Sequence, residues 1–128
     1  MRIVRRPERG RPAEAISMDA SFEDFPMPLE YLHGMAIQAS WEGTSLDGVL
    51  ALEVSNHAFA NNTSNELLPD ADQVWTPVTG SSVTVDEDTG NHMWDISEMY
   101  YEAVRVVYTA NAGTGEVKLY YLGKSDAA

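Results

Sequence analysis

The sequence predicts an all-β protein, an antiparallel, jelly-roll-like β-sandwich that carries an extended N-terminal arm. Beyond Pro28 apolar residues recur at every second position, which is the pattern of half-buried strands, and Gly-rich turns separate the alternating segments. Seven or eight short strands with almost no helix are typical of a sandwich. The 128 residues are expected to form an arm and anchor segment over residues 1–28 and one sandwich domain over residues 29–128.

The first eleven residues carry a charge opposite to that of the remaining chain. They hold five arginines and one glutamate, a net charge of +4, whereas residues 12–128 hold three cations and nineteen carboxylates, a net charge of −16. A short Arg-rich segment buries too little apolar surface to fold alone, so we expect it to be disordered in solution and available to an acidic partner. The expected partner-binding residues are Arg2, Arg5, Arg6, Arg9 and Arg11.

A segment rich in Phe and Pro joins this arm to the sandwich. Pro26 and Pro28 forbid a helix interior and favour extended chain. Phe22 and Phe25 are the large apolar residues of the segment. We therefore expect these two side chains to anchor the arm to the sandwich.

The clearest local pattern predicts a hairpin over residues 35–55. Ile37, Ala39 and Trp41 share one face, and Leu50, Leu52 and Val54 resume a buried face after a loop. That loop contains Asp47-Gly48, a common turn dipeptide. Residues 35–42 and 49–55 are accordingly expected to pair with each other, with Trp41 in the core.

The later strands are separated by one long loop and several turns. Residues 56–73 are rich in Asn, Ser and Asp, which predicts a surface loop with a helical turn near residues 66–68. Alternating β-branched and aromatic residues make residues 100–109 the strongest strand prediction, followed by a turn and a returning strand. The expected segments are strands over 75–78, 82–85, 93–96, 100–109 and 117–121, with turns over 86–90 and 111–115.

The candidate motifs predict structure rather than chemistry. Gly113-Thr-Gly115 lies between strands, which favours a hairpin turn over a phosphate-binding loop. The histidines share no ligand spacing, and the acidic runs 70–72 and 86–88 lack the pattern of a calcium loop, so we expect solvated turns. A hydrolytic triad stays open, because triads are recognised by geometry. We expect no enzyme, no metal and no cofactor.

Composition excludes several partners. The chain has no cysteine, so disulfides and thiolate metal sites are absent, and no apolar run is long enough for a membrane span or a signal peptide. The strongly acidic sandwich would repel nucleic acid, so a nucleic-acid partner is not expected.

Arg105 is the single cation between Arg11 and Lys118 and lies in an apolar strand, which favours a structural ion pair.

Several segments together resemble small β-sandwich virion structural proteins of tailed bacteriophages, of the capsid decoration or cement type. The resemblance covers about residues 35–124 and leaves out the arm. Its motifs are sheet-forming patterns, so it implies a fold and membership of a virion rather than a position in the particle. The segments that carry it are Ile37-Gln-Ala-Ser-Trp41-Glu-Gly43-Thr, residues 46–56, Trp75-Thr-Pro-Val78, residues 101–109 and Gly113-Thr-Gly115.

A weaker likeness is to sandwich domains of the discoidin, galactose-binding type. Ser55-Asn56 followed later by a tryptophan, and Tyr101-Glu-Ala-Val104-Arg105, are similar to segments of that family. His57 stands where that family usually has an aspartate, so no ligand set carries over. This likeness leaves a carbohydrate-binding module of a tail tip or fibre as an alternative, with Trp75 and Trp94 as sugar-stacking residues.

The sequence therefore predicts a non-enzymatic structural protein, a decoration or cement protein on the outer surface of a capsid. It would be made in the bacterial cytoplasm and would bind the major capsid protein or neighbouring virion subunits through its arm. A homo-oligomer, dimer or trimer, is expected. Such a protein would stabilise the shell by binding its assembled state.

Overall fold

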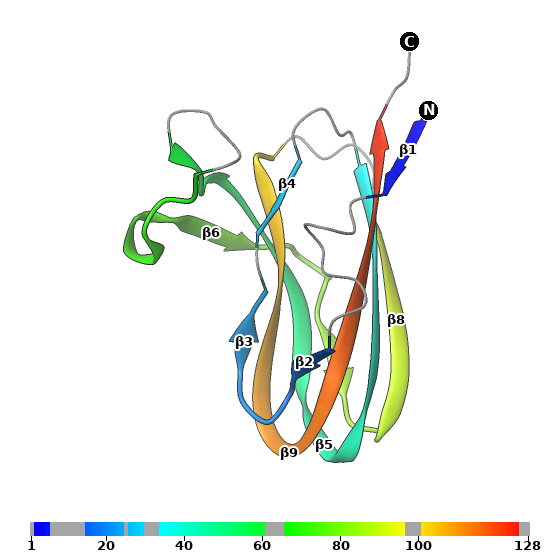
Figure 1. Cartoon of the computed structure of the whole chain (residues 1–128). Coiled ribbons are helices and arrows are strands. Elements are labelled where there is room, and N and C mark those ends of the chain that lie inside the picture. The colour runs from blue at the N-terminus through cyan, green and yellow to red at the C-terminus, as the bar shows by residue number, and fades with distance from the viewer. Residues whose placement is uncertain are drawn as a thin grey trace.

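A computed structural model describes residues 2–5, 15–24, 26–29, 34–60, 66–96 and 101–125, with backbone alone for residues 2–5, 124 and 125. It confirms the predicted antiparallel β-sandwich (Figure 1). The strands are β1 (Arg2–Arg5), β2 (Ala15–Ser17), β3 (Phe22–Glu23), β4 (Met27–Pro28), β5 (Gly34–His57), β6 (Val74–Pro77), β7 (Val83–Val85), β8 (Thr89–Ile96) and β9 (Ala103–Ser125), with a 3-10 turn at Asp70–Asp72.

Two long strands, β5 and β9, form the frame of the sandwich. They pair antiparallel from Gly34 and Lys124 to Ser55 and Ala103, and both bend back at the same end of the molecule (Figure 1). The first half of β5 and the second half of β9 form one layer with β1, β2 and β8. The other halves form the second layer with β3, β4, β6 and β7. One bent two-stranded ribbon therefore supplies the centre of both layers.

The predicted hairpin over residues 35–55 is wrong in its pairing. Residues 35–42 and 49–55 lie in different layers, and each pairs with β9 instead of with the other. The turn predicted over residues 111–115 is likewise the bend of β9. At the bend Thr44 pairs with Thr114 and Asp47 with Ala112, so β5 uses three residues where β9 uses two. Gly48 then pairs with Ala110, so β9 uses two residues where β5 uses one. Each strand thus carries one extra residue, the signature of a β-bulge.

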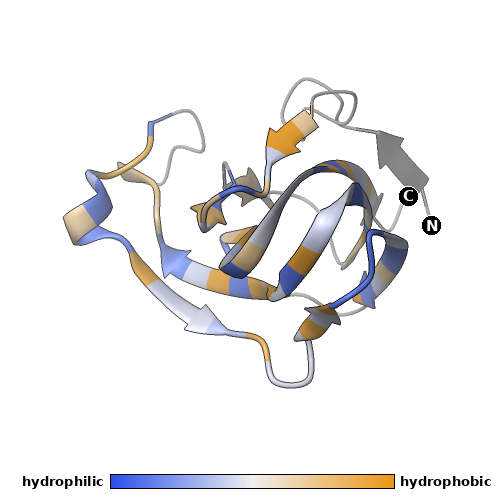
Figure 2. Ribbon diagram, turned by 90° about the horizontal axis from the view of Figure 1, so that it is seen from below, coloured by the Kyte–Doolittle hydropathy of each residue, from blue (hydrophilic) through white to orange (hydrophobic). Residues whose placement is uncertain are grey.

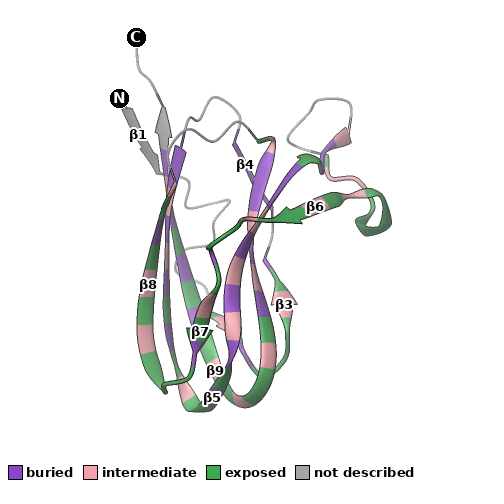
Figure 3. Cartoon of the chain, turned by 180° about the vertical axis from the view of Figure 1, so that it is seen from behind, coloured by how far each residue is buried: buried purple, intermediate pink, exposed green. Residues whose placement is uncertain are grey.

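The two bulges explain the change in which residues face the core. In a strand that bends without a bulge, every second side chain points toward the core throughout. One extra residue exchanges the two faces, so that even-numbered side chains point inward after the bulge where odd-numbered ones did before it. In β5 the buried apolar side chains have odd numbers from Met35 to Trp41 and even numbers from Leu50 to Val54. Figures 2 and 3 show this alternation of hydropathy and burial along both strands.

The hydrophobic core fills the space between the two layers. Trp41 is buried in it, which confirms its predicted place. Met18 and Met27 from the N-terminal segment are also fully buried in this core. The other buried members are Leu29, Met35, Ile37, Ala39, Leu46, Leu50, Leu52, Val54, Val85, Trp94, Val104, Val106, Tyr108, Val117, Leu119 and Tyr121.

The N-terminal segment is extended, as predicted, but its described part belongs to the sandwich. Strands β1 to β4 all pair with β9. The ring of Phe22 is half-buried and lies 5.7 Å from the ring of Tyr108, a contact that fits the anchor role. Phe25 lies outside the described residues. These strands are only two to four residues long, so period-two alternation was not visible in the sequence.

The long loop also differs from its prediction. A helical turn was expected near residues 66–68, but Leu67 forms a β-bridge with Phe59, and the 3-10 turn lies at Asp70–Asp72. Glu102 holds the start of this loop, because its Oε1 accepts hydrogen bonds of 2.9 Å from the backbone N–H groups of Ala58 and Phe59. β8 begins at Thr89, inside the segment predicted as an acidic turn.

Two buried tyrosines are expected to respond oppositely to loss of their hydroxyl groups. The Tyr121 hydroxyl donates a 2.7 Å hydrogen bond to Oδ2 of buried Asp24, whereas the Tyr108 hydroxyl has no partner among the described residues. Tyr121→Phe should lower the free energy of unfolding by about 2 kcal/mol, and Tyr108→Phe should leave it unchanged or raise it by up to about 1 kcal/mol. Urea unfolding of the two variants measures both effects; equal losses would contradict the different environments.

Tyr108 also predicts an alkaline effect. Burial, together with the negative charge of Asp47, raises the pKa of the Tyr108 phenol above its ordinary value of 10.0. The fold therefore favours the neutral phenol, and the associated stability is complete below pH 10 and is lost as the pH rises through the folded-state pKa. Above about pH 10, wild type should lose stability more steeply than Tyr108→Phe.

Candidate functional site

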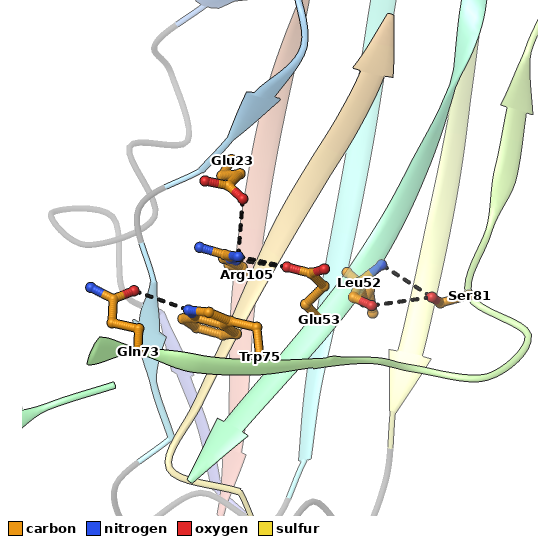
Figure 4. A network of polar contacts seen from close by, with 7 residues as sticks. All are labelled: Glu23, Leu52, Glu53, Gln73, Trp75, Ser81 and Arg105. Carbon is orange, nitrogen blue, oxygen red and sulfur yellow. Dashed lines mark hydrogen bonds and ion pairs between the residues drawn. The ribbon is translucent and has the colours of Figure 1, made fainter. Parts of the chain in front are cut away.

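The most developed polar arrangement lies around Arg105 on the outer face of the second layer (Figure 4). Its Nε donates a 2.9 Å hydrogen bond to Oε1 of Glu53, which lies opposite Arg105 on β5. Its Nη2 atom lies 2.7 Å from the same oxygen and 3.1 Å from Oε2 of Glu23 on β3. The Arg105 side chain is only 12% exposed. The predicted structural ion pair is thus confirmed, with two carboxylates.

Trp75 on β6 packs against the guanidinium group of Arg105. The guanidinium carbon of Arg105 lies 4.1 Å from the centre of the Trp75 ring, within the range of a cation–π contact. The indole N–H donates a 2.9 Å hydrogen bond to Oε1 of Gln73 (Figure 4). The half-buried ring also packs, as Leu67 does, against a small buried cluster formed by Ala58, Phe59 and Ala103. One face of the Trp75 ring is therefore already occupied by Arg105.

Trp94 was a candidate sugar-stacking residue under the carbohydrate-binding alternative, and its burial contradicts that role. Its side chain is 6% exposed and belongs to the core between the layers. Its indole N–H donates a 2.8 Å hydrogen bond to the backbone carbonyl of Ser81. Trp75 and Trp94 also stand on strands of different layers, so they form no shared platform. Sequence alternation could not assign Trp94, because its strand is an edge strand with a half-buried inner face.

Ser81 shows how side chains replace strand pairing in this layer. It lies between β6 and β7, which both pair with β5 but leave Leu52 between them. The Ser81 hydroxyl accepts a 3.1 Å hydrogen bond from the N–H of Leu52 and lies 3.4 Å from its carbonyl (Figure 4). It also donates a 2.7 Å bond to the carbonyl of Val78. This buried hydroxyl therefore has a structural role.

A shallow groove of about 660 Å³ lies along β6. The end of β5 forms one wall, and Tyr101 and Val74, which are 44% and 60% exposed, contribute its largest apolar surfaces. Sequence reasoning did not identify this groove, because its walls come from three separate segments. The described residues that line it include no Asp, Glu, Lys or Arg; they are Val54, Ser55, Asn56, His57, Val74, Thr76, Pro77, Val78, Thr79 and Tyr101.

The basic segment is only partly described. β1 pairs with the end of β9, and its register places Arg2 opposite Ser125 and Arg5 opposite Leu122. The structure therefore fixes the backbone of two of the five predicted partner-binding arginines at the margin of the first layer. Arg6, Arg9 and Arg11 lie outside the described residues.

Within the described residues, no group of three or more His, Asp or Glu side chains is arranged to hold a metal ion. In the same part of the chain, none of the helical segments is long and apolar enough to cross a membrane.

Comparison with known proteins supports the fold. No protein-family model matches the sequence, and no curated protein matches it significantly. The solved crystal structure of PirA matches 84% of this chain and 91% of its own chain, with a TM-score of 0.51 and 14% sequence identity. At that identity, the likeness to PirA is one of fold alone.

Two further solved structures are similar over most of the chain but superpose more loosely. A Bacillus endospore appendage, described as a disulfide-linked pilus, matches 97% of this chain and 89% of its own, with a TM-score of 0.38 and 10% identity. The coat protein of Tobacco streak virus matches 91% of this chain and 90% of its own, with a TM-score of 0.41 and 10% identity. Neither supports a conclusion about this chain.

Proposed function

We propose that this chain is a non-enzymatic structural protein of an assembled particle, and in particular a decoration or cement protein on the outer surface of a tailed-phage capsid. The proposal rests on the separation of charge along the chain: residues 1–11 carry a net charge of +4, and residues 12–128 carry −16. A basic segment can bind an acidic partner surface, whereas an acidic sandwich at the outside of a particle discourages aggregation. The protein would be made in the bacterial cytoplasm and act in the virion.

The roles of the described polar groups agree with a structural protein. Arg105 and Glu53 join two strands, Glu102 holds a loop, and the Ser81 hydroxyl replaces a strand partner. Each of these groups is engaged in the fold itself. The groove along β6 is open, and its described lining residues include no Asp, Glu, Lys or Arg.

The structure changes how the arm must be tested. Deleting residues 1–11 would also remove the backbone pairing between β1 and β9, so lost binding would have two explanations. Replacing the five arginines with glutamine keeps the backbone and removes only the charge. On purified capsids of the phage that encodes the chain, we expect this variant to show at least tenfold lower occupancy and a weaker salt dependence than wild type.

The matched control is Lys118→Gln, which removes one exposed cation from the sandwich. It should bind as wild type does if the arm supplies the attraction. Thermal unfolding of both variants checks that the sandwich remains folded. Unchanged occupancy after neutralisation of all five arginines would reject the arm as the binding element.

A further inference from the structure

Strand β8 is the longest exposed edge in the described sheets. Its eight residues pair with β5 along their whole length, and within the described segments no strand pairs with its other side. Figures 1 and 3 show it at the margin of the molecule from opposite directions. An open edge of this length presents unpaired backbone groups that can add another strand.

The other edges of the sandwich carry features that oppose strand addition, whereas β8 does not. β2, β3, β4 and β7 are only two or three residues long, β4 and β6 end at Pro28 and Pro77, and β1 carries Arg2 and Arg5. Proline, charge and short length are the usual protections of an edge. β8 contains no Pro, Lys or Arg and a single carboxylate, that of Asp95. In a chain of net charge −12, this edge is nearly neutral.

The hydrogen-bond pattern shows which backbone groups face the open side. The Gly43 N–H donates to the Asp88 carbonyl across the start of the β5–β8 pair, and the register then runs unbroken from Glu42 opposite Thr89 to Met35 opposite Ile96. Backbone groups of an antiparallel strand alternate in direction from residue to residue. Even-numbered residues of β8 therefore point toward β5, and the N–H and C=O groups of Thr89, Asn91 and Met93 point outward.

We propose that β8 pairs with β8 of a second copy, antiparallel, with His92 on the two-fold axis. In this register Asn91 of each copy lies opposite Met93 of the other, and the two pairs exchange four backbone hydrogen bonds. Asp95 lies opposite Thr89, so like charges do not meet across the seam. A second copy fits this edge because the symmetric register centred on His92, near the middle of β8, pairs outward groups with outward groups and joins the first layers of both copies into one continuous sheet.

This inference specifies the homo-oligomer that the sequence predicts, and it rests on the proposed structural function. Its test uses the isolated full-length chain without capsids, so a failure of dimerisation and a failure of particle binding are separate results. The exposed outer face of the same layer, where Met93, Gln38 and Tyr120 form one row across three strands, gives the competing mode of contact. Two copies stacked through that face would form a dimer without edge pairing.

Asn91→Pro is the discriminating variant. It removes an N–H that points outward while leaving the pairing with β5 intact, and proline is tolerated at such edge positions. In sedimentation equilibrium, wild type should be a dimer, and Asn91→Pro should raise the dimer dissociation constant at least about thirtyfold with an unchanged melting temperature. The control Tyr120→Lys should remain dimeric, because Tyr120 lies two strands from the seam. The opposite result for the two variants would overturn the proposal in favour of face stacking.

Cysteine cross-linking tests the register independently of the proline variant. The chain has no cysteine, so a single introduced cysteine reports one position. His92→Cys would place two cysteines on the axis in a pair without hydrogen bonds, with Cα atoms about 4.5 Å apart, which permits a disulfide. We expect His92→Cys to cross-link at least tenfold faster than Met93→Cys. Faster cross-linking at Met93, or a wild-type chain that is monomeric at its highest soluble concentration, would overturn the proposal.

Discussion

Gly113→Ala is expected to lower the free energy of unfolding by more than about 4 kcal/mol, because it combines backbone strain with a collision against backbone atoms. Gly113 stands at the bend of β9 with a φ of 90°, a conformation that costs residues with a Cβ about 1–2 kcal/mol. A Cβ would also lie 2.6 Å from the carbonyl carbon of Ser45 and 2.8 Å from Cα of Leu46. Both are backbone atoms of the bent β5, so they cannot turn aside.

Gly80→Ala is the matched control for this prediction. Gly80 has a φ of 80°, and a Cβ there would have no atom within 4 Å. It shares the backbone strain but not the collision, so its loss should stay near about 1 kcal/mol. Urea unfolding of the two variants gives the comparison. Similar losses at both glycines would mean that the ribbon can separate at its bend, contrary to the close packing of β5 on β9.

The bend also shows why the sequence predicted the strands well but their pairing badly. Alternation identified residues 35–42, 49–55, 100–109 and 117–121 as strand segments, because burial of one face depends on local spacing. The partner of β5 is β9, and Ile37 pairs with Tyr121 across more than eighty residues. A Gly-rich turn signal is the same whether the chain closes a hairpin or bends through a bulge. Only long-range pairing distinguishes the two.

The candidate site was likewise predictable only in part. The isolation of Arg105 among apolar residues was enough to predict an ion pair, because a lone cation on a sheet needs a carboxylate. Its partners could not be predicted, since Glu53 and Glu23 lie 52 and 82 residues away in sequence. Trp75 and Trp94 look alike in sequence, yet one packs under an arginine and the other lies in the core. Their difference depends on which strands lie beside them.

Arg105→Leu is expected to lower the free energy of unfolding by about 2–4 kcal/mol, because it leaves the partly buried Glu53 carboxylate without its cation. Glu53 is 21% exposed, so water compensates this loss only in part, whereas Glu23 at 64% exposed is readily hydrated. Arg105→Lys should lose roughly half as much, since an ammonium keeps the charge but not the planar contact with Trp75 or the Nε–H bond. Thermal and urea unfolding of both variants test this order.

A double-mutant cycle separates the ion pair from simple packing on β5 and β9. Glu53→Leu alone should also destabilise the protein, but Arg105→Leu combined with Glu53→Leu should be more stable than the sum of the two single losses by about 1–3 kcal/mol. The two leucines would stand opposite each other in the register now held by the charged pair, where Trp75 can still pack on them. Strict additivity would show that Arg105 acts through Trp75 alone, and that Glu53 contributes nothing to holding it.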